Sequence, residues 1–348
     1  MLGQEPARRL PRQAALRQSG DYRPPWWCRS GHLQTVWGPL FRRGGLAARR
    51  ERLVTPDEDF LDLDWVEPAS PSTTLLLVLH GLEGSSRSHY AVGLARGAVA
   101  RGWRAAILNF RSCSGELNRA RRFYHSGETG DLGEVVRRLL AREPRLALLV
   151  AGVSLGGNVL IKWLGERGEE TPAQLAGAVA ISTPFDLAPC TRALDSGVRR
   201  RIYTANFLRT MRAKVRAKAA RDGGFANRVD VVAAAGARTF AEYDRAVTAP
   251  LGGFADELDY WRRASSAPWL ARVRRPTLLI NALDDPIVPP EALPDPRGLP
   301  RWVRAEFTPH GGHAGFLEGT WPWRLGSWAE RRAVAFLAEC LPAHTRIC

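Results

Sequence analysis

Short apolar runs alternate with stretches of helical period between residues 75 and 182. An unbroken apolar run of roughly four to eight residues is typical of a strand buried on both faces of a sheet. Such runs predict strands over 75–79, 105–110, 146–153 and 176–182. The intervening segments predict helices over 90–100, 131–142 and 157–166. Strands that alternate with helices of this length indicate an α/β fold, with a mostly parallel central sheet and helices on both faces.

The pattern changes on either side of this region. Residues 51–67 alternate between apolar and polar positions, which predicts an antiparallel hairpin or short edge strands. The strand–helix alternation stops over 184–268, where residues 201–220 have apolar positions at helical spacing and arginines on the other side. Strands are expected again over 277–281 and 303–308, and a final helix over 327–341. We therefore divide the chain into an N-terminal arm (1–50), a first core part (51–183), an inserted helical cap (184–268) and a second core part (269–348).

The N-terminal arm and the cysteines bear on the compartment. The arm is rich in arginine and proline, and we expect it to be irregular, with Trp26 and Trp27 docked on the main domain. No apolar stretch follows the first arginines, so no secretory signal is expected. No apolar run approaches the roughly 20 residues that a membrane span needs. The five cysteines include no Cys-x-x-Cys pair, which argues against a disulfide scaffold or a zinc site and favours the reducing cytoplasm.

The chain is strongly basic, with a formal net charge of +15. Such a balance is typical of proteins that bind nucleic acid or anionic membranes. Lysine occurs only at Lys162, Lys214 and Lys218, so 47 of the 50 basic residues are arginine. The arginines are scattered, which is typical of a solvated surface rather than of a nucleic-acid site. We expect no nucleic-acid partner, and at most a weak attraction to acidic lipid or acyl anions through peripheral membrane contact.

A candidate nucleophile follows the most apolar run. Residues 152–156 read Gly-Val-Ser-Leu-Gly, between an expected strand and an expected helix. This is the context of a nucleophile elbow, a tight turn that lifts a serine hydroxyl above the sheet. Side chains two positions before and after the serine would collide in such a turn, and Gly152 and Gly156 have none. The pattern predicts Ser154 as the nucleophile.

A second loop predicts the oxyanion hole. His80-Gly81-Leu82-Glu83-Gly84 follows the first buried strand, where this type of fold supplies a backbone N–H to the oxyanion. We expect the N–H groups of Leu82 and Leu155 to form the hole, and His80 to have a structural role. A base and a carboxylate must complete the site, because a serine hydroxyl is a weak nucleophile until its proton is removed.

The acid and the base are expected after the nucleophile, in the order carboxylate then histidine. Two strand ends supply them, one with Asp284 and Asp285 and the other with His310 and His313. We prefer Asp285 because Pro-Ile-Val follows it, and His313 because it lies between a glycine and an alanine. Both expected loops lie at the carboxyl ends of strands, where α/β sheets place their sites.

With these residues in place, the chain resembles the AB hydrolase 4 (YheT-like) family of α/β-hydrolases. The resemblance covers most of the chain outside the first twenty or so residues and the cap. It is carried by seven motifs: Gly31–Thr35, Asp59–Trp65, His80–Gly84, Asn109–Gly115, Tyr124–Thr129, Gly152–Asn158 and Gly311–Phe316. It implies an α/β-hydrolase fold and a serine hydrolase whose triad is Ser154, Asp285 and His313. Members are described as esterases, lipases or acyltransferases.

Two places in the chain differ from patterns found in relatives. Ser112 stands where the family pattern leads us to expect glycine after Arg111, which narrows a turn near the site but leaves the triad intact. Some relatives carry a His-x4-Asp motif of acyltransferases, whereas the spacing from His125 to Asp131 is one residue longer. We expect His125 and Glu128 to hold a loop.

The expected function is hydrolysis of carboxylic esters with short or medium acyl chains, through an acyl-enzyme. The partner is then a small-molecule or lipid ester, and no metal or cofactor is implied. Acyl transfer to an alcohol by the same triad is the alternative within enzymes. A non-catalytic basic binding protein on a degenerate scaffold is the alternative from another class.

Overall fold

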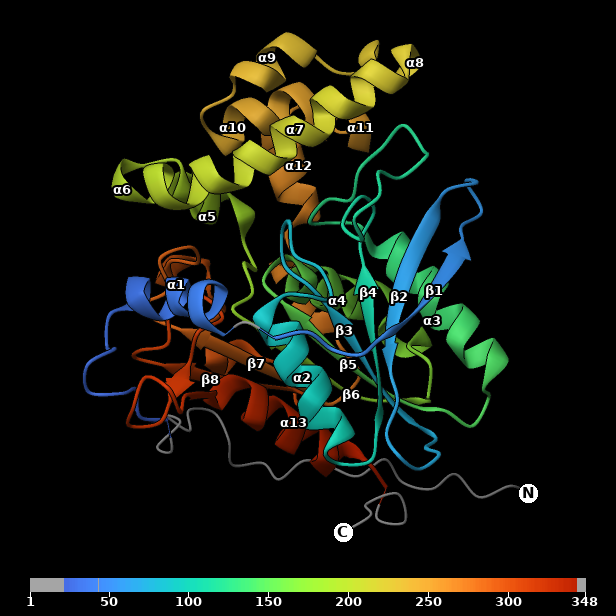
Figure 1. Cartoon of the computed structure of the whole chain (residues 1–348), viewed down its shortest axis with the longest axis vertical. Coiled ribbons are helices and arrows are strands. Elements are labelled where there is room, and N and C mark those ends of the chain that lie inside the picture. The colour runs from blue at the N-terminus through green and yellow to red at the C-terminus, as the bar shows by residue number, and fades with distance from the viewer. Residues whose placement is uncertain (1–21, 43, 343–348) are drawn as a thin grey trace.

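An eight-stranded sheet forms the centre of the computed structural model, which describes residues 22–42 and 44–342 (Figure 1). The strands are β1 (Arg49–Val54), β2 (Phe60–Val66), β3 (Thr74–Leu79), β4 (Arg104–Asn109), β5 (Ala147–Val153), β6 (Leu175–Ile181), β7 (Thr277–Ala282) and β8 (Val303–Thr308). Their order across the sheet is β1-β2-β4-β3-β5-β6-β7-β8. Strands β3 to β8 are parallel to one another, and β1 and β2 form the antiparallel hairpin expected over 51–67, with β2 antiparallel to β4. The prediction of a mostly parallel sheet is confirmed.

Helices cover both faces of the sheet and enclose two cores. One face carries α2 (His89–Val99) and α13 (Trp328–Cys340), and the other carries α3 (Thr129–Arg142) and α4 (Leu155–Arg167). Strand β3 shows why its apolar run is unbroken. Leu75, Leu77 and Leu79 pack toward α3 and α4, while Leu76 and Val78 pack toward α2 and α13. Successive side chains of a strand point to opposite faces, so a strand between two helical layers needs apolar residues at every position.

A helical segment connects β6 to β7 and lies beyond the carboxyl ends of the strands (Figure 1). Its helices are α5 (Leu187–Leu194), α6 (Gly197–Arg199), α7 (Ala205–Arg221), α8 (Gly223–Ala226), α9 (Val231–Gly236), α10 (Phe240–Tyr243), α11 (Ala249–Gly252) and α12 (Glu257–Ala264). The segment has its own apolar core, to which α7 contributes Leu208, Met211 and Val215. Helix α7 begins later than the expected residue 201, because residues 200–204 form a π-helical turn. That turn leaves Ile202 exposed rather than on the packed face.

The N-terminal arm differs from the expected irregular chain, since it contains α1 (Gly31–Phe41). Its first 21 residues lie outside the described ones. Helix α1 is held by tertiary contacts rather than by propensity. Gln34 is fully buried, donates to Cys28 O (3.0 Å) and accepts from the N–H of Leu317 (2.9 Å). Trp27 docks as expected, with its indole N–H donating to Thr320 O (3.0 Å), whereas Trp26 stays exposed.

Two short strands that were not expected from the sequence, β9 (Leu317–Glu318) and β10 (Gly326–Ser327), pair beside α1 as an antiparallel ribbon. Among the described residues, Cys28, Cys113 and Cys190 are free thiols. Within the same part of the chain, no helix combines the length and the apolar composition of a membrane span.

Candidate active site

Ser154 occupies a strained turn between β5 and α4. Its backbone has φ 55° and ψ −121°, a region that residues with a side chain seldom adopt. A Cβ at Gly152 would lie 2.4 Å from the carbonyl oxygen of Gly156, and one at Gly156 would lie 2.5 Å from that of Leu79. Only glycine therefore fits on either side of the serine, and the turn presents the hydroxyl at the end of the sheet.

Hydrogen bonds connect Ser154 to His313 and His313 to Asp285. The His313 Nε2 atom lies 2.9 Å from Ser154 Oγ, and His313 Nδ1 lies 2.8 Å from Asp285 Oδ2. The other oxygen of Asp285 accepts from the backbone N–H groups of Ile287 (2.7 Å) and Val288 (3.0 Å). A carboxylate only accepts hydrogen bonds, so Nδ1 carries the imidazole proton and Nε2 is free to accept the serine proton.

Asp284 and His310, the alternative acid and base, point elsewhere. Asp284 accepts from the N–H of Gly312 (2.9 Å) and lies 3.3 Å from His310 Nδ1. Burial raises the pKa of Asp284. These contacts hold the loop that carries His313, whereas the bond to the His313 ring itself comes from Asp285.

In the loop after β3, two backbone N–H groups donate to tyrosine hydroxyls, and among the described residues the N–H between them has no acceptor. The Gly81 N–H donates to Tyr90 Oη (2.9 Å) and the Glu83 N–H donates to Tyr124 Oη (2.7 Å). Between them, the Leu82 N–H has no acceptor among the described residues, and neither has the Leu155 N–H in the first turn of α4. A Cβ at Gly81 would lie 3.1 Å from the Cβ of Ser154, so this loop passes close to the serine.

His80 is structural, as the sequence analysis expects. It is fully buried, and its Nδ1 donates to the carbonyl oxygen of Gly81 (2.7 Å) while its Nε2 accepts from the N–H of Phe110 (3.1 Å). Burial lowers the pKa of His80 to about 4. The neutral ring thus joins the ends of β3 and β4 and takes no part in proton transfer.

Two hollows meet at Ser154 and His313. An inner cavity of about 110 Å³ extends under the helical segment. Its apolar lining includes Leu187, Cys190, Leu194, Phe207, Met211 and Phe240. An outer groove of about 580 Å³ runs from the same two residues past α1, where Pro39 and Leu40 line it. Ser154 therefore lies between a small, mainly apolar cavity and a wider groove.

One carboxyl group lines the inner cavity. Asp244 accepts from the Thr248 hydroxyl (2.6 Å) and from the Trp261 indole N–H (2.9 Å). Burial raises the pKa of Asp244 to about 7. The cavity therefore has one carboxyl group in a wall that is mainly apolar.

Sequence reasoning missed the residues that hold the histidine loop. Thr35 of α1 accepts from the N–H of His313 (2.8 Å) and donates to the carbonyl oxygen of Gly31 (2.6 Å). A Cβ at Gly312 would lie 2.3 Å from that same carbonyl oxygen. The motif Gly31–Thr35 was the only sequence signal, and its physical reason is this close packing of α1 on the loop.

A buried ion network connects two other motifs. The Arg111 guanidinium is only 2% exposed and donates to Asp59 (2.5 Å) and to Asp131 (2.8 and 2.7 Å). Asp59 also accepts from the side chain of Asn118 (2.6 Å) and from the N–H of Arg119 (2.6 Å). The network joins the β1–β2 turn, the loop after β4 and the start of α3, and the loop after β4 continues to Tyr124 and His125, which line the inner cavity.

Ser112, where glycine is expected, has a positive φ of 63°. This left-handed conformation is easy for glycine and strained for serine. The Ser112 hydroxyl accepts from the N–H of Asn118 (3.0 Å) and donates to Asn118 Oδ1 (2.7 Å), which offsets the strain. The departure from the family pattern is therefore compensated locally.

Two of the three lysines tie α7 to the core. Lys214 Nζ donates to Glu83 Oε1 (2.7 Å) and lies 3.6 Å from Cys113 Sγ. Lys218 Nζ donates to the carbonyl oxygen and to the Oδ1 of Asn118, both at 2.8 Å. Burial lowers the pKa of Lys218 to about 8. Because Glu83 follows Leu82, the Lys214 ion pair connects the helical segment to the loop beside Ser154.

His125 and Asp131 do not act as a pair. His125 Nδ1 accepts from the N–H of Gly127 (3.1 Å), and burial lowers the pKa of His125 to about 4. Asp131 is bound to Arg111 instead, and Glu128 pairs with Arg122 and caps α3 through the N–H of Asp131. These contacts agree with the expectation that His125 and Glu128 hold a loop.

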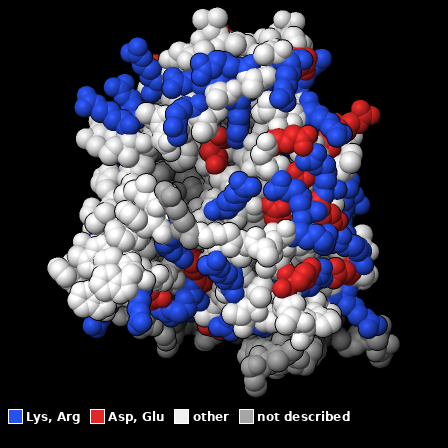
Figure 2. Space-filling view, in the orientation of Figure 1, with Lys and Arg blue, Asp and Glu red and all other residues white. Residues whose placement is uncertain are grey.

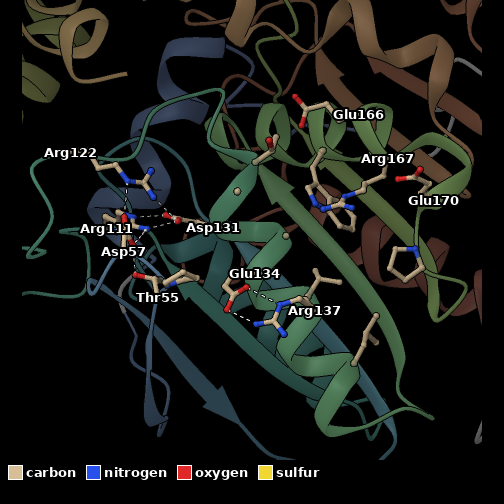
Figure 3. A pocket seen from close by; sticks show the side chains of 18 residues that line it. Thr55, Asp57, Arg111, Arg122, Asp131, Glu134, Arg137, Glu166, Arg167 and Glu170 are labelled. Carbon is tan, nitrogen blue, oxygen red and sulfur yellow. Dashed lines mark hydrogen bonds and ion pairs between the residues drawn. The ribbon is translucent and has the colours of Figure 1, made fainter. Parts of the chain in front are cut away.

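A separate cavity, of about 730 Å³, lies between α3, α4 and the β1–β2 turn, and none of its lining residues belongs to the Ser154 site (Figure 3). Arg111 and Arg122 pair with Asp57 there, and Arg137 pairs with Glu134. Charges that pair with one another are typical of a groove between helices rather than of a reaction site. Over residues 22–42 and 44–342, no three His, Cys, Asp or Glu side chains converge as a metal ion would require.

Comparisons with known proteins agree with this architecture. Residues 74–320 match a family model described as the alpha/beta hydrolase fold. The chain is 39% identical over 315 residues to "Putative esterase YheT" of Escherichia coli, with 90% of this chain and 91% of that one covered. It is 30% identical over 321 residues to human "Phospholipase ABHD3", with 89% and 76% covered. The Pyrococcus furiosus esterase Pf2001 superposes with a TM-score of 0.52 at 15% identity, covering 85% of this chain and 92% of that one, which shows a shared fold.

Proposed function

The chain belongs to the α/β-hydrolase family and is YheT-like, and on this premise we propose that it is a serine esterase with Ser154 as nucleophile, His313 as base and Asp285 as the residue that orients His313. The observation that carries the proposal is the continuous hydrogen-bonded series from Asp285 Oδ2 through the His313 ring to Ser154 Oγ. A relative that is named an esterase and another that is named a phospholipase support ester hydrolysis as the reaction class.

The proposed reaction has two halves. Ser154 Oγ attacks the ester carbonyl carbon while His313 Nε2 takes the hydroxyl proton, and the carbonyl oxygen becomes an oxyanion. The Leu82 and Leu155 N–H groups stabilise that oxyanion, and the helix dipole of α4 adds to their effect. The C–O bond to the alcohol then breaks, and His313 returns its proton to the leaving alcohol. In the second half, water gives a proton to His313 and attacks the acyl carbon, the bond between that carbon and Ser154 Oγ breaks, and His313 returns the proton to Oγ as the acid leaves.

The two hollows indicate how the substrate would lie. We place the acyl chain in the inner cavity and the alcohol part in the outer groove. The inner cavity, at about 110 Å³, is well below the roughly 300–1,000 Å³ of pockets that enclose drug-sized ligands, which favours short or medium acyl chains. The residues between 184 and 268 would then act as a cap that limits the chain length.

A series of p-nitrophenyl esters from acetate to palmitate tests this function. We expect kcat/KM to peak at a short or medium acyl chain and Ser154→Ala to abolish turnover. Phe207→Ala and Met211→Ala enlarge the inner cavity, so both should move the optimum to longer chains and leave kcat for the acetate within a few fold. An unchanged profile in both folded variants would refute the cap's role, and turnover by Ser154→Ala would refute the esterase mechanism.

Water is the favoured acceptor of the acyl group, because the wider outer groove also reaches Ser154. Adding an alcohol during turnover distinguishes hydrolysis from transfer. Product that remains mainly acid supports hydrolysis, whereas a rising share of ester in proportion to the alcohol supports acyl transfer.

A further inference from the structure

Large apolar side chains are exposed together around α1. Phe41, Trp321 and Trp323 are 62%, 52% and 76% exposed, and Leu40 is 51% exposed. We call these four residues the aromatic rim. Soluble proteins rarely expose a contiguous apolar patch of this kind without a partner.

Ring contacts and a shared groove make the rim continuous. Trp37 packs against Phe41 with ring centroids 4.4 Å apart and against Trp27 at 4.8 Å. Phe41 and Trp323 line the same groove between α1, α2 and the β9–β10 ribbon. Trp321 stacks on Trp323 at 5.6 Å with their planes 8° apart. The rim thus spans two segments that are far apart in the sequence, the end of α1 and the turn between β9 and β10.

The rim borders the mouth of the outer groove. Leu40 lines that groove together with Ser154 and His313, and its neighbour Phe41 lines the groove that also contains Trp323. Helix α1 therefore separates the aromatic turn from the opening that leads to the serine. Figure 1 shows α1 beside the carboxyl ends of the strands, below α5 and α6.

Positive charge surrounds the rim. Arg87 lines the outer groove with Leu40, Arg96 lines the groove that contains Phe41 and Trp323, and Arg324 follows Trp323 in the sequence. All three arginines are exposed, and none of them pairs with a carboxylate of the described residues. The two nearby carboxylates, Glu318 and Glu330, are occupied by Arg331 and Arg42. Figure 2 shows a broad face without charged side chains over α1 and the neighbouring turns, with basic side chains along its borders.

We propose that the aromatic rim docks on the surface of an anionic lipid bilayer, with the outer groove facing the lipid. Tryptophan concentrates at the level of lipid headgroups because its ring is apolar and its indole N–H is polar. Unpaired arginines bind lipid phosphates and are attracted by the negative surface potential. A groove that opens beside the rim receives an ester directly from the lipid layer. Docking is a property of the surface and does not depend on the proposed chemistry at Ser154.

Co-sedimentation of the full-length protein with lipid vesicles tests the proposal. Vesicles of phosphatidylcholine alone are compared with vesicles that also contain phosphatidylglycerol. We expect at least roughly ten-fold stronger partition onto the anionic vesicles, because each arginine near the surface contributes about five-fold. The triple variant Phe41→Ser/Trp321→Ser/Trp323→Ser should lose roughly ten-fold or more of this partition.

The matched control changes three exposed apolar residues outside the rim, Val198, Val232 and Leu258, to serine. This variant should bind the anionic vesicles within about two-fold of wild type, and circular dichroism checks that both variants fold. Equal binding by the rim variant and wild type overturns the proposal, as does the absence of wild-type binding to anionic vesicles. Sedimentation velocity adds a further outcome, since self-association that the rim variant abolishes would mean that a second copy covers the rim.

Discussion

Replacing Asp285 by asparagine changes the tautomer of His313 while leaving the shape of the site intact. Asp285 Oδ1 accepts two backbone N–H groups, those of Ile287 and Val288, and Oδ2 accepts from His313 Nδ1. An asparagine must keep its carbonyl oxygen on the two N–H donors, so its amide N–H₂ faces His313. The imidazole then accepts at Nδ1 and carries its proton on Nε2, where it meets Ser154 Oγ as a donor. In that tautomer His313 cannot take the serine proton.

The expected loss in kcat is about 10⁴-fold, the size of the effect of the same substitution in the well-studied serine protease triad. This corresponds to about 5 kcal/mol in the activation free energy. Asp284→Asn is the control, because Asp284 bonds to the N–H of Gly312 and to His310 but not to the His313 ring. We expect that variant to lose less than about ten-fold in the hydrolysis of p-nitrophenyl acetate. A larger loss for Asp284→Asn than for Asp285→Asn would refute the assignment of the carboxylate.

Two further predictions concern stability. Arg111→Leu leaves buried Asp59 without its ion-pair partner and leaves Asp131 with only the longer contact to Arg122 (3.4 Å), so urea unfolding should show a loss of about 3–5 kcal/mol. Arg137→Leu, which removes an exposed guanidinium, should shift the unfolding midpoint little, and equal shifts would contradict the reasoning. The pKa of Asp244 is about 7 in the folded protein, above its unfolded value of 3.8. Its contribution to the free energy of unfolding is therefore complete at low pH and is lost as the pH rises toward 7. Asp244→Asn removes this dependence on pH. The unfolding free energy of the variant, taken relative to wild type, should rise by up to about 4 kcal/mol between about pH 4 and about pH 8. A difference that does not change with pH would contradict the raised pKa of Asp244.

The central sheet could be predicted because its strands are buried on both faces. The run expected over 146–153 is β5, Ala147–Val153, and its neighbours lie within one or two residues of the expected bounds. Helix α4 begins at Leu155 rather than at the expected residue 157, because the strained turn at Ser154 leads directly into the first helical residue. Local pattern was sufficient wherever burial alone decides the residue type.

Contacts between distant segments could not be predicted in the same way. Helix α1 contains Gly38 and Pro39 and has no side-chain cap, so its sequence does not favour a helix. Its contacts with the His313 loop and with Leu317 stabilise it instead. The Arg111–Asp59 bond joins residues 52 positions apart. No spacing rule identifies such a pair, although both residues lie in motifs of the family. The rarity of lysine was visible in the sequence, but the role of Lys214 in tying α7 to Glu83 was not.

Covalent labelling with a fluorophosphonate probe, followed by mass spectrometry of the labelled peptide, tests the central claim most directly. The probe reacts with a serine only when a base activates its hydroxyl, so the label reports the nucleophile itself. We predict one modified residue, Ser154, and no labelling of the folded Ser154→Ala variant. A label on another serine that persists in Ser154→Ala would contradict the account.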